Sequence, residues 1–196
     1  VTGTDIREDL ADLGIDAEAV PEWSEGVHEA VTADGRRLAI RVLGRDEWEN
    51  QLAVAVWRFL WYRKSSGRAL VGHRQRIERE ALLMLLAQTQ GVPITPVIAA
   101  GSSSTGDAVI ATELRGRPLD ELDGDALGDD ALDRAWAALA DLHGARVAHG
   151  ALDGDALRID DEGQVLLASF ERAEALVEPS QVHADRAQLL VATALA

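Results

Sequence analysis

The sequence predicts an α+β protein in which a β-rich first half with one prominent helix precedes a mainly helical second half that carries a short hairpin. Three observations predict this class. Apolar residues alternate on both sides of Asp34-Gly35, a dipeptide typical of hairpin turns. Apolar residues recur at helical spacing over 47–63 and 129–148. Strand-like and helix-like segments come in runs, which favours α+β over a doubly wound parallel sheet.

The first half is expected to begin with a short helix. Asp5 and Glu8 have the spacing of a capping box, and Gly14 stands where this helix would end. The Asp34-Gly35 turn then joins two strands, because this dipeptide tolerates the positive φ that tight hairpins need. The expected strands cover 27–32, 37–43, 97–100 and 108–114, the last two extending the same sheet, and the expected helices cover 47–63 and 74–90.

The second half is expected to contain two helices that flank a hairpin. The segment 129–148 has a continuous apolar face and predicts an amphipathic helix. Short alternating segments at 157–159 and 165–167 surround the turn Asp161-Glu162-Gly163, which predicts two paired strands. The final segment, 185–196, is helical in pattern.

Composition and charge exclude several function classes. The 196 residues include 19 basic and 34 acidic residues, a formal net charge of −15, so a nucleic-acid backbone would be repelled. The chain has no cysteine, which excludes disulfides, thiolate metal sites and a thiol nucleophile. The histidines show no zinc-site spacing, and no metal site is expected.

The chain also carries signs of being a fragment. It begins at Val1, and its only methionine is Met84. The longest apolar run, 81–87, is far too short to span a bilayer. We therefore expect a soluble piece excised from a longer protein.

Five short segments carry a resemblance when they are taken in order. Leu38-Ala39-Ile40-Arg41 is followed by a Glu80-containing helical segment, then by His149-Gly150-Ala151-Leu152 with Ala156 four residues on, then by Ala168-Ser169-Phe170-Glu171, and last by Asp185. Together they resemble the protein-kinase-like fold in its aminoglycoside-phosphotransferase-like branch. The resemblance extends from about residue 27 to the end of the chain.

The resemblance implies a two-lobe architecture. Residues 1–26 would form a leading helix and linker, and residues 27–116 an N-lobe with an antiparallel sheet and a C-helix. Residues 117–196 would form a truncated, mainly helical C-lobe with a degenerate catalytic loop. In this fold the third-strand position, here Arg41, normally pairs with a C-helix glutamate, here Glu80. Asp185 would begin the helix whose aspartate braces the catalytic loop.

The groups that phosphoryl transfer requires are missing from their positions. A kinase needs a third-strand lysine, a catalytic-loop aspartate, and an asparagine and an aspartate that hold magnesium. Here these positions read Arg41, Ala151, Ala156 and Ser169. The only lysine, Lys64, and the only asparagine, Asn50, lie elsewhere, so no shift of register restores them. The pattern predicts a pseudokinase, with no cofactor and no magnesium, and leaves ATP binding open.

Four site residues keep alternative interpretations. The planar guanidinium of Arg41 suits a structural ion pair better than a phosphate contact. Asp153 and Asp155 are either substitute ligands for a nucleotide or metal, or turn-forming residues. His149 is either a core residue bonded to the backbone or a chemical group.

A narrower resemblance concerns the segments 43–47, 57–63 and 185–194. These are similar to one group of bacterial membrane proteins, in which a kinase-like cytoplasmic domain precedes a flippase-like membrane region related to lysylphosphatidylglycerol synthase. The likeness implies a location on the cytoplasmic side of the membrane. It also implies a protein partner or the parent's own membrane domain as the binding partner.

A basic, aromatic segment is a candidate docking surface. Residues 58–79 carry seven basic and one acidic residue in an otherwise acidic chain. Such a segment either contacts an anionic membrane surface or is a solvated face, and its tryptophans either contact a partner or pack on the sheet. The residues of this candidate surface are Trp57, Trp61, Arg58, Arg63, Lys64 and Arg68.

Three functional hypotheses follow from the sequence. The first is a catalytically inactive kinase-like domain that serves as a regulatory or docking module of a bacterial membrane protein. The second is a divergent ATP-dependent small-molecule phosphotransferase that uses Arg41, Asp153 and Asp155. The third is an acidic α+β binding domain of another kind.

Overall fold

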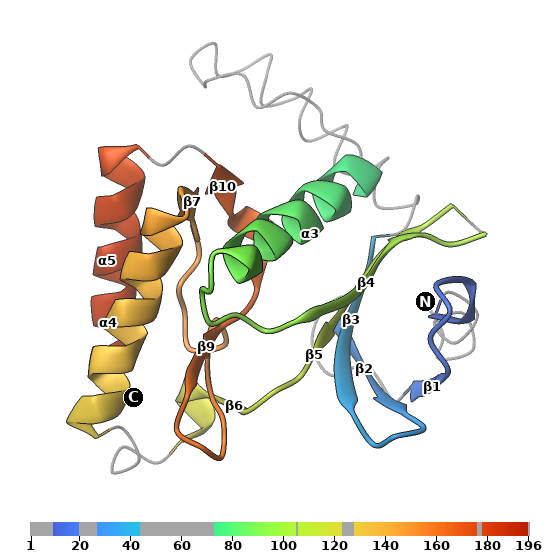
Figure 1. Cartoon of the computed structure of the whole chain (residues 1–196), viewed down its shortest axis with the longest axis horizontal. Coiled ribbons are helices and arrows are strands. Elements are labelled where there is room, and N and C mark those ends of the chain that lie inside the picture. The colour runs from blue at the N-terminus through green and yellow to red at the C-terminus, as the bar shows by residue number, and fades with distance from the viewer. Residues whose placement is uncertain are drawn as a thin grey trace. The chain divides into compact units, whose positions relative to one another are not determined.

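The computed structural model describes residues 10–19, 27–43, 73–104, 106–122, 128–175 and 178–195. These residues form an α+β protein with antiparallel strand pairing (Figure 1). The chain divides into two compact units, the first comprising residues 1–79 and 98–112 and the second residues 80–97 and 113–196. In this division residues 80–97 group with the second unit. The lobe boundaries stay a prediction.

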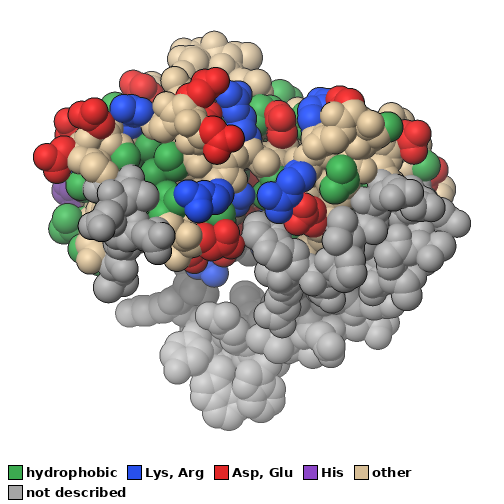
Figure 2. Space-filling view, turned by 90° about the horizontal axis from the view of Figure 1, so that it is seen from below, with side chains coloured by type: hydrophobic (Ala, Val, Ile, Leu, Met, Phe, Trp, Pro, Cys, Tyr) green, Lys and Arg blue, Asp and Glu red, His purple; other side chains and the backbone are tan. Residues whose placement is uncertain are grey.

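Charged side chains of both signs lie among one another on the face that Figure 2 draws. Figure 2 shows acidic and basic side chains interspersed with hydrophobic ones on one face of the molecule. Among the described residues, no helix is both long enough and apolar enough to cross a lipid bilayer.

The first unit is built on a five-stranded sheet with the strand order β1-β2-β3-β5-β4. The hairpin predicted around Asp34-Gly35 is confirmed, with β2 and β3 at the predicted bounds, and β5 and β4 extend this sheet as predicted. The short strand β1 pairs antiparallel with β2 and was not predicted. The bounds are β1 Ala17–Ala19, β2 Val27–Thr32, β3 Arg37–Leu43, β4 Val97–Ser102 and β5 Ala108–Glu113.

Local hydrogen bonds explain the β2–β3 turn. Gly35 has φ +83°, a conformation that costs a glycine little. Its N–H donates to the carbonyl of Thr32 at 2.8 Å. The Asp34 carboxylate accepts hydrogen bonds from the Thr32 hydroxyl and the Arg36 guanidinium, and the first of these lowers the pKa of Asp34. The turn is therefore specified by contacts within residues 32–36 and needs no distant contact.

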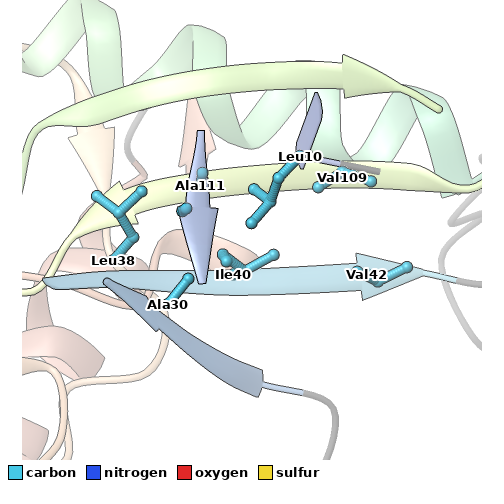
Figure 3. Close-up of a cluster of buried hydrophobic side chains, with 8 residues drawn as sticks. Leu10, Ala30, Leu38, Ile40, Val42, Val109 and Ala111 are labelled. Carbon is cyan, nitrogen blue, oxygen red and sulfur yellow. The ribbon is translucent and has the colours of Figure 1, made fainter. Parts of the chain in front are cut away.

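The core of the first unit lies on one face of this sheet (Figure 3). Leu38, Ile40 and Val42 alternate along β3 with more exposed residues, as expected for a half-buried strand. They pack with Leu10, which precedes the sheet and is 0% exposed. The other members of this cluster are Ala17, Ala30, Val109 and Ala111.

The helix predicted at 74–90 is confirmed as α3, His73–Thr89. Its buried residues include Ile77, Met84 and Ala87, which share one helical face. The chain leaves the helix at Gly91, which has φ +81°, and Val92 N–H bonds back to the carbonyl of Ala87 at 3.1 Å. This is the glycine-terminated helix end that the sequence indicates.

The second unit contains two long helices that lie side by side, α4 and α5, and two small sheets (Figure 1). One sheet has the order β6-β8-β9, and the other pairs β10 with β7. The predicted 157–167 hairpin is confirmed as the β8–β9 pair. The bounds are β6 Arg117–Pro118, η1 Leu119–Glu121, α4 Asp129–Gly144, β7 Val147–Ala148, β8 Leu157–Ile159, β9 Val165–Leu167, η3 Phe170–Arg172, β10 Glu174–Ala175 and α5 Pro179–Leu195.

The predicted extension of α4 to residue 148 is wrong. The helix ends at Gly144, and Arg146 adopts φ +61°. Val147 then pairs with Ala175 and is 0% exposed. Burial of Val147 in a strand pair replaces the helical turn that local periodicity favours, because tertiary packing outweighs helix propensity.

The last helix begins earlier than the sequence predicts. α5 starts at Pro179, a residue well suited to the first helical turn. Gln181 Oε1 accepts a hydrogen bond from Glu178 N–H at 2.7 Å, which supplies the N-terminal cap. The capping box at residues 5–8 and the helix predicted over 47–63 lie outside the described residues.

Candidate functional site

The loop between β7 and β8 holds the residues that the kinase resemblance assigns to the catalytic loop. It begins at His149, and Gly150 adopts φ +80°. A Cβ on Gly150 would lie 2.6 Å from the carbonyl oxygen of Arg172. This position therefore requires glycine both for its backbone conformation and for the close approach of a second segment.

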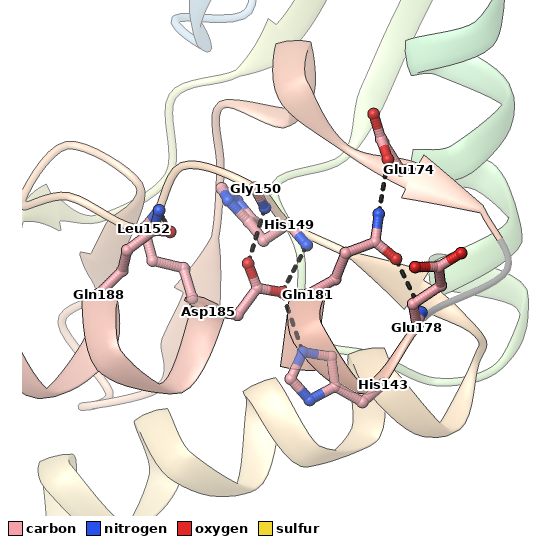
Figure 4. Close-up of polar contacts among 9 residues, drawn as sticks. All are labelled: His143, His149, Gly150, Leu152, Glu174, Glu178, Gln181, Asp185 and Gln188. Atoms are coloured by element: carbon pink, nitrogen blue, oxygen red, sulfur yellow. Dashed lines mark hydrogen bonds and ion pairs between the residues drawn. The ribbon is translucent and has the colours of Figure 1, made fainter. Parts of the chain in front are cut away.

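Asp185 of α5 holds the start of this loop in place (Figure 4). One carboxylate oxygen accepts the backbone N–H of Gly150 at 2.8 Å, and the other accepts the backbone N–H of His149 at 2.8 Å. The second oxygen also lies 2.9 Å from His143 Nε2. Asp185 is 1% exposed, so a buried carboxylate is satisfied entirely by the loop and by α4.

A second residue of α5 supports the next part of the loop. The side-chain carbonyl of Gln188 accepts the backbone N–H of Leu152 at 2.9 Å. Gln188 lies three residues after Asp185, so both side chains project from neighbouring positions on the helix. The sequence analysis missed Gln188, although its spacing from Asp185 is a usable signal.

His149 is built into the interior of the second unit. Its ring is 0% exposed and contacts Phe170 edge-on, with ring centroids 4.9 Å apart. Nε2 lies 2.7 Å from the carbonyl oxygen of Ala168, so Nε2 carries the proton and Nδ1 does not. Burial lowers the pKa of His149, which keeps the ring neutral. These contacts favour the structural interpretation of this histidine over the chemical one.

The positions that the kinase resemblance assigns to magnesium ligands lie next to each other, but their side chains carry no carboxylate. The N–H of Ala168 donates to the carbonyl of Ala156 at 2.9 Å, which brings residue 156 close to the segment that contains Ser169. Ala156 is 0% exposed and has no side-chain donor atom. Ser169 adopts a left-handed backbone, φ 60°, and offers only a neutral hydroxyl. Magnesium prefers carboxylate oxygens, and neither residue provides one.

The position that the kinase resemblance assigns to the catalytic base, Ala151, also lacks a side chain that could act as a base. Ala151 is partly exposed and lies between two residues whose N–H groups are held by α5. A methyl group cannot accept the proton of a substrate hydroxyl. The loop therefore keeps a fixed backbone around a position that cannot act as a base.

Asp153 and Asp155 have different roles in the same turn. The Asp153 carboxylate accepts the N–H of Ala156 at 3.2 Å, which is the turn-forming contact. Burial, and next the negative charges of Asp120 and Asp153, raise the pKa of Asp155. In the parts of the chain that the structure describes, no group of three or more His, Cys, Asp or Glu residues is arranged to hold a metal ion.

The two residues of the predicted ion pair belong to different units. Arg41 lies in β3 of the first unit. Glu80 lies in α3, is 8% exposed, and belongs to the second unit. Their pairing stays a prediction.

The predicted docking surface lies outside the described residues. This applies to all of its members, Trp57, Trp61, Arg58, Arg63, Lys64 and Arg68. Among the basic residues of segment 58–79, those whose side chains the structure describes are Arg76 and Arg79, which are exposed on α3. Contact of this segment with a membrane or a partner stays a prediction.

No family model matches the sequence, and none of the curated proteins matches it.

Proposed function

We propose that this chain is a catalytically inactive kinase-like domain that acts as a regulatory or docking module of a bacterial membrane protein. One observation carries the proposal. Asp185 holds the loop that begins at His149, while the positions that would perform phosphoryl transfer are Ala151, Ala156 and Ser169. A braced loop without a base or metal ligands is suited to binding and not to turnover.

The charges around the loop support the same conclusion. Asp153 and Asp155 lie in the loop, and the raised pKa of Asp155 reflects its burial and the neighbouring carboxylates. The charge of Arg158 offsets part of this effect on Asp155, but the carboxylates outnumber it, and an excess of negative charge repels the phosphates of a nucleotide. The membrane-protein context rests on the sequence resemblance of residues 43–47, 57–63 and 185–194.

The test is a thermal-shift titration with ATP and ADP at about 1 mM, each with and without magnesium. A ligand that binds the native state alone raises the melting temperature by mass action. We expect no magnesium-dependent shift and no release of phosphate from ATP. A shift that does not need magnesium fits a nucleotide-sensing form of the same inactive domain.

A magnesium-dependent shift together with ATP hydrolysis would overturn the proposal. If that activity disappears in Asp153→Ala but persists in Asp133→Ala, the chain is a divergent ATP-dependent phosphotransferase. Asp133 is a suitable control because it is an exposed aspartate on α4, away from the loop in sequence.

A further inference from the structure

The outer face of α5 is apolar over its second half. Asp185 and Leu189 face the interior and are 1% and 0% exposed. On the opposite side of the helix, Leu190 and Val191 are 60% and 56% exposed. These side chains follow the i, i+3, i+4, i+7 spacing of one helical face. The α5 stripe, as we define it, consists of Ala187, Leu190, Val191 and Ala194, all exposed.

A pocket of about 660 Å³ in the second unit adjoins this stripe. Ala187 and Val191 line the pocket and also belong to the stripe, so the two form one continuous apolar surface. Leu122 and Leu152 supply the facing apolar wall. The contact of Leu152 N–H with Gln188 fixes that wall against α5 before any partner arrives. A preformed surface loses little conformational entropy on binding.

The charges at this pocket define the chemistry of its partner. The ionisable residues of the lining are Asp120 and Asp153, and both are exposed acids. Asp155 lies in the same turn as Asp153, and the negative charges of Asp120 and Asp153 both disfavour its ionised form. A cation placed at this edge would relieve that repulsion and would find two carboxylates on a surface whose other side chains, apart from Gln188, are apolar.

We infer that the pocket and the α5 stripe together dock a basic amphipathic helix of a partner protein. The stripe is long enough to meet about two turns of a partner helix, since Ala187 and Ala194 are seven positions apart and each position rises about 1.5 Å. An apolar side chain of the partner enters the pocket between Leu152 and Val191. Lysine or arginine residues that flank it lie opposite Asp120 and Asp153. This is the helix-in-groove mode of recognition. The inference rests on the proposed docking role and names its partner class.

The test uses the complete 196-residue chain and a fluorescent synthetic peptide of about 18 leucine and lysine residues, with leucine at i, i+3, i+4 and i+7. Two peptides of matched composition serve as controls, one with scrambled order and one with glutamate in place of lysine. Fluorescence anisotropy measures the Kd. We expect the amphipathic basic peptide to bind at least about tenfold more tightly than either control.

Matched double variants locate the binding surface. Leu190→Ser with Val191→Ser removes two large apolar side chains of the stripe. Leu82→Ser with Leu86→Ser removes two exposed leucines of α3, which are 65% and 39% exposed. We expect the first pair to weaken binding at least about tenfold and the second pair to leave it unchanged. Asp120→Asn should weaken binding and reduce its dependence on salt, while Asp133→Asn should not.

Several results would overturn the inference. An equal loss of peptide affinity in both double variants would mean nonspecific adhesion. Binding of the glutamate peptide as tightly as the lysine peptide would refute the cationic partner. If the chain alone sediments as a dimer that the Leu190/Val191 variant dissociates, a second copy occupies the surface. The assay contains no nucleotide, so hydrolysis of ATP would refute the inactive-kinase proposal without changing the peptide result.

Discussion

The Asp185 carboxylate accepts the backbone N–H of Gly150 at 2.8 Å, although the two residues are 35 positions apart in the sequence. The same carboxylate accepts the N–H of His149 and meets His143 on α4. One buried acid therefore connects α4, α5 and the loop after β7. Its removal is expected to affect the loop and the stability of the second unit together.

Replacing Asp185 with asparagine should destabilise the protein by about 3 kcal/mol, because an amide places N–H groups against N–H donors and leaves buried donors unpaired. The free energy of unfolding in urea measures the change. Asp133→Asn makes the same change of charge at an exposed position on α4 and should alter stability by less than about 0.5 kcal/mol. Similar values for the two variants would refute the bracing role.

His149 should make the protein less stable in acid. Burial lowers the pKa of its ring from 6.5, so the unfolded chain takes up the proton first as the pH falls. The stability that depends on a neutral His149 is complete above pH 6.5 and is lost as the pH falls from there through the lower folded pKa. Urea unfolding at several values between about pH 5 and pH 8 measures this loss.

The variant His149→Gln isolates that contribution. Glutamine can still donate to the carbonyl of Ala168 but does not titrate. The stability difference between wild type and variant should therefore shrink as the pH falls, while the other histidines contribute equally to both proteins. A difference that stays constant with pH would contradict a depressed pKa at His149.

Gly150→Ala should cost about 3 kcal/mol or more, because the new Cβ meets the Arg172 carbonyl in addition to the strain of a positive φ. Gly91→Ala is the matched control. Gly91 has φ +81° but open space around its missing side chain, so its substitution should cost only about 1 kcal/mol. Equal losses in chemical denaturation would show that the Arg172 segment moves away without cost.

Leu10→Ala should cost about 2–5 kcal/mol, since Leu10 is completely buried against the sheet of the first unit. Leu82→Ala removes the same atoms from a side chain that is 65% exposed and should cost well under about 1 kcal/mol. Denaturant unfolding distinguishes the two variants by the midpoint of the transition, while the slope of the unfolding free energy against denaturant concentration stays unchanged. A small loss for Leu10 would mean that the segment before β1 contributes little to the core.

The sequence predicts best where the physical cause is local. The β2–β3 hairpin depends on Asp34-Gly35 and on alternation within a few residues, and the chain leaves α3 at Gly91, two residues after the last helical residue. The predicted end of α4 is wrong for the opposite reason, because a distant contact decides it. Val147 continues the helical spacing of apolar residues in the sequence. In the folded chain it pairs instead with Ala175, which lies far from it in the sequence.

The candidate site divides in the same way. The order of the motifs led to predictions about His149, Asp185, Ala151, Ala156 and Ser169, because residue types can be read without coordinates. The sequence could not show that Gly150 faces the Arg172 carbonyl, or that Gln188 holds Leu152.

The apolar pattern of α5 illustrates what tertiary structure alone decides. Leu189, Leu190 and Val191 are equally apolar in the sequence, yet the first is buried and the other two are exposed. Helical periodicity defines which residues share a face, but the elements packed around the helix determine which face is covered. Burial is a property of those long-range contacts, so the exposed stripe and the adjoining pocket emerge only in the folded second unit.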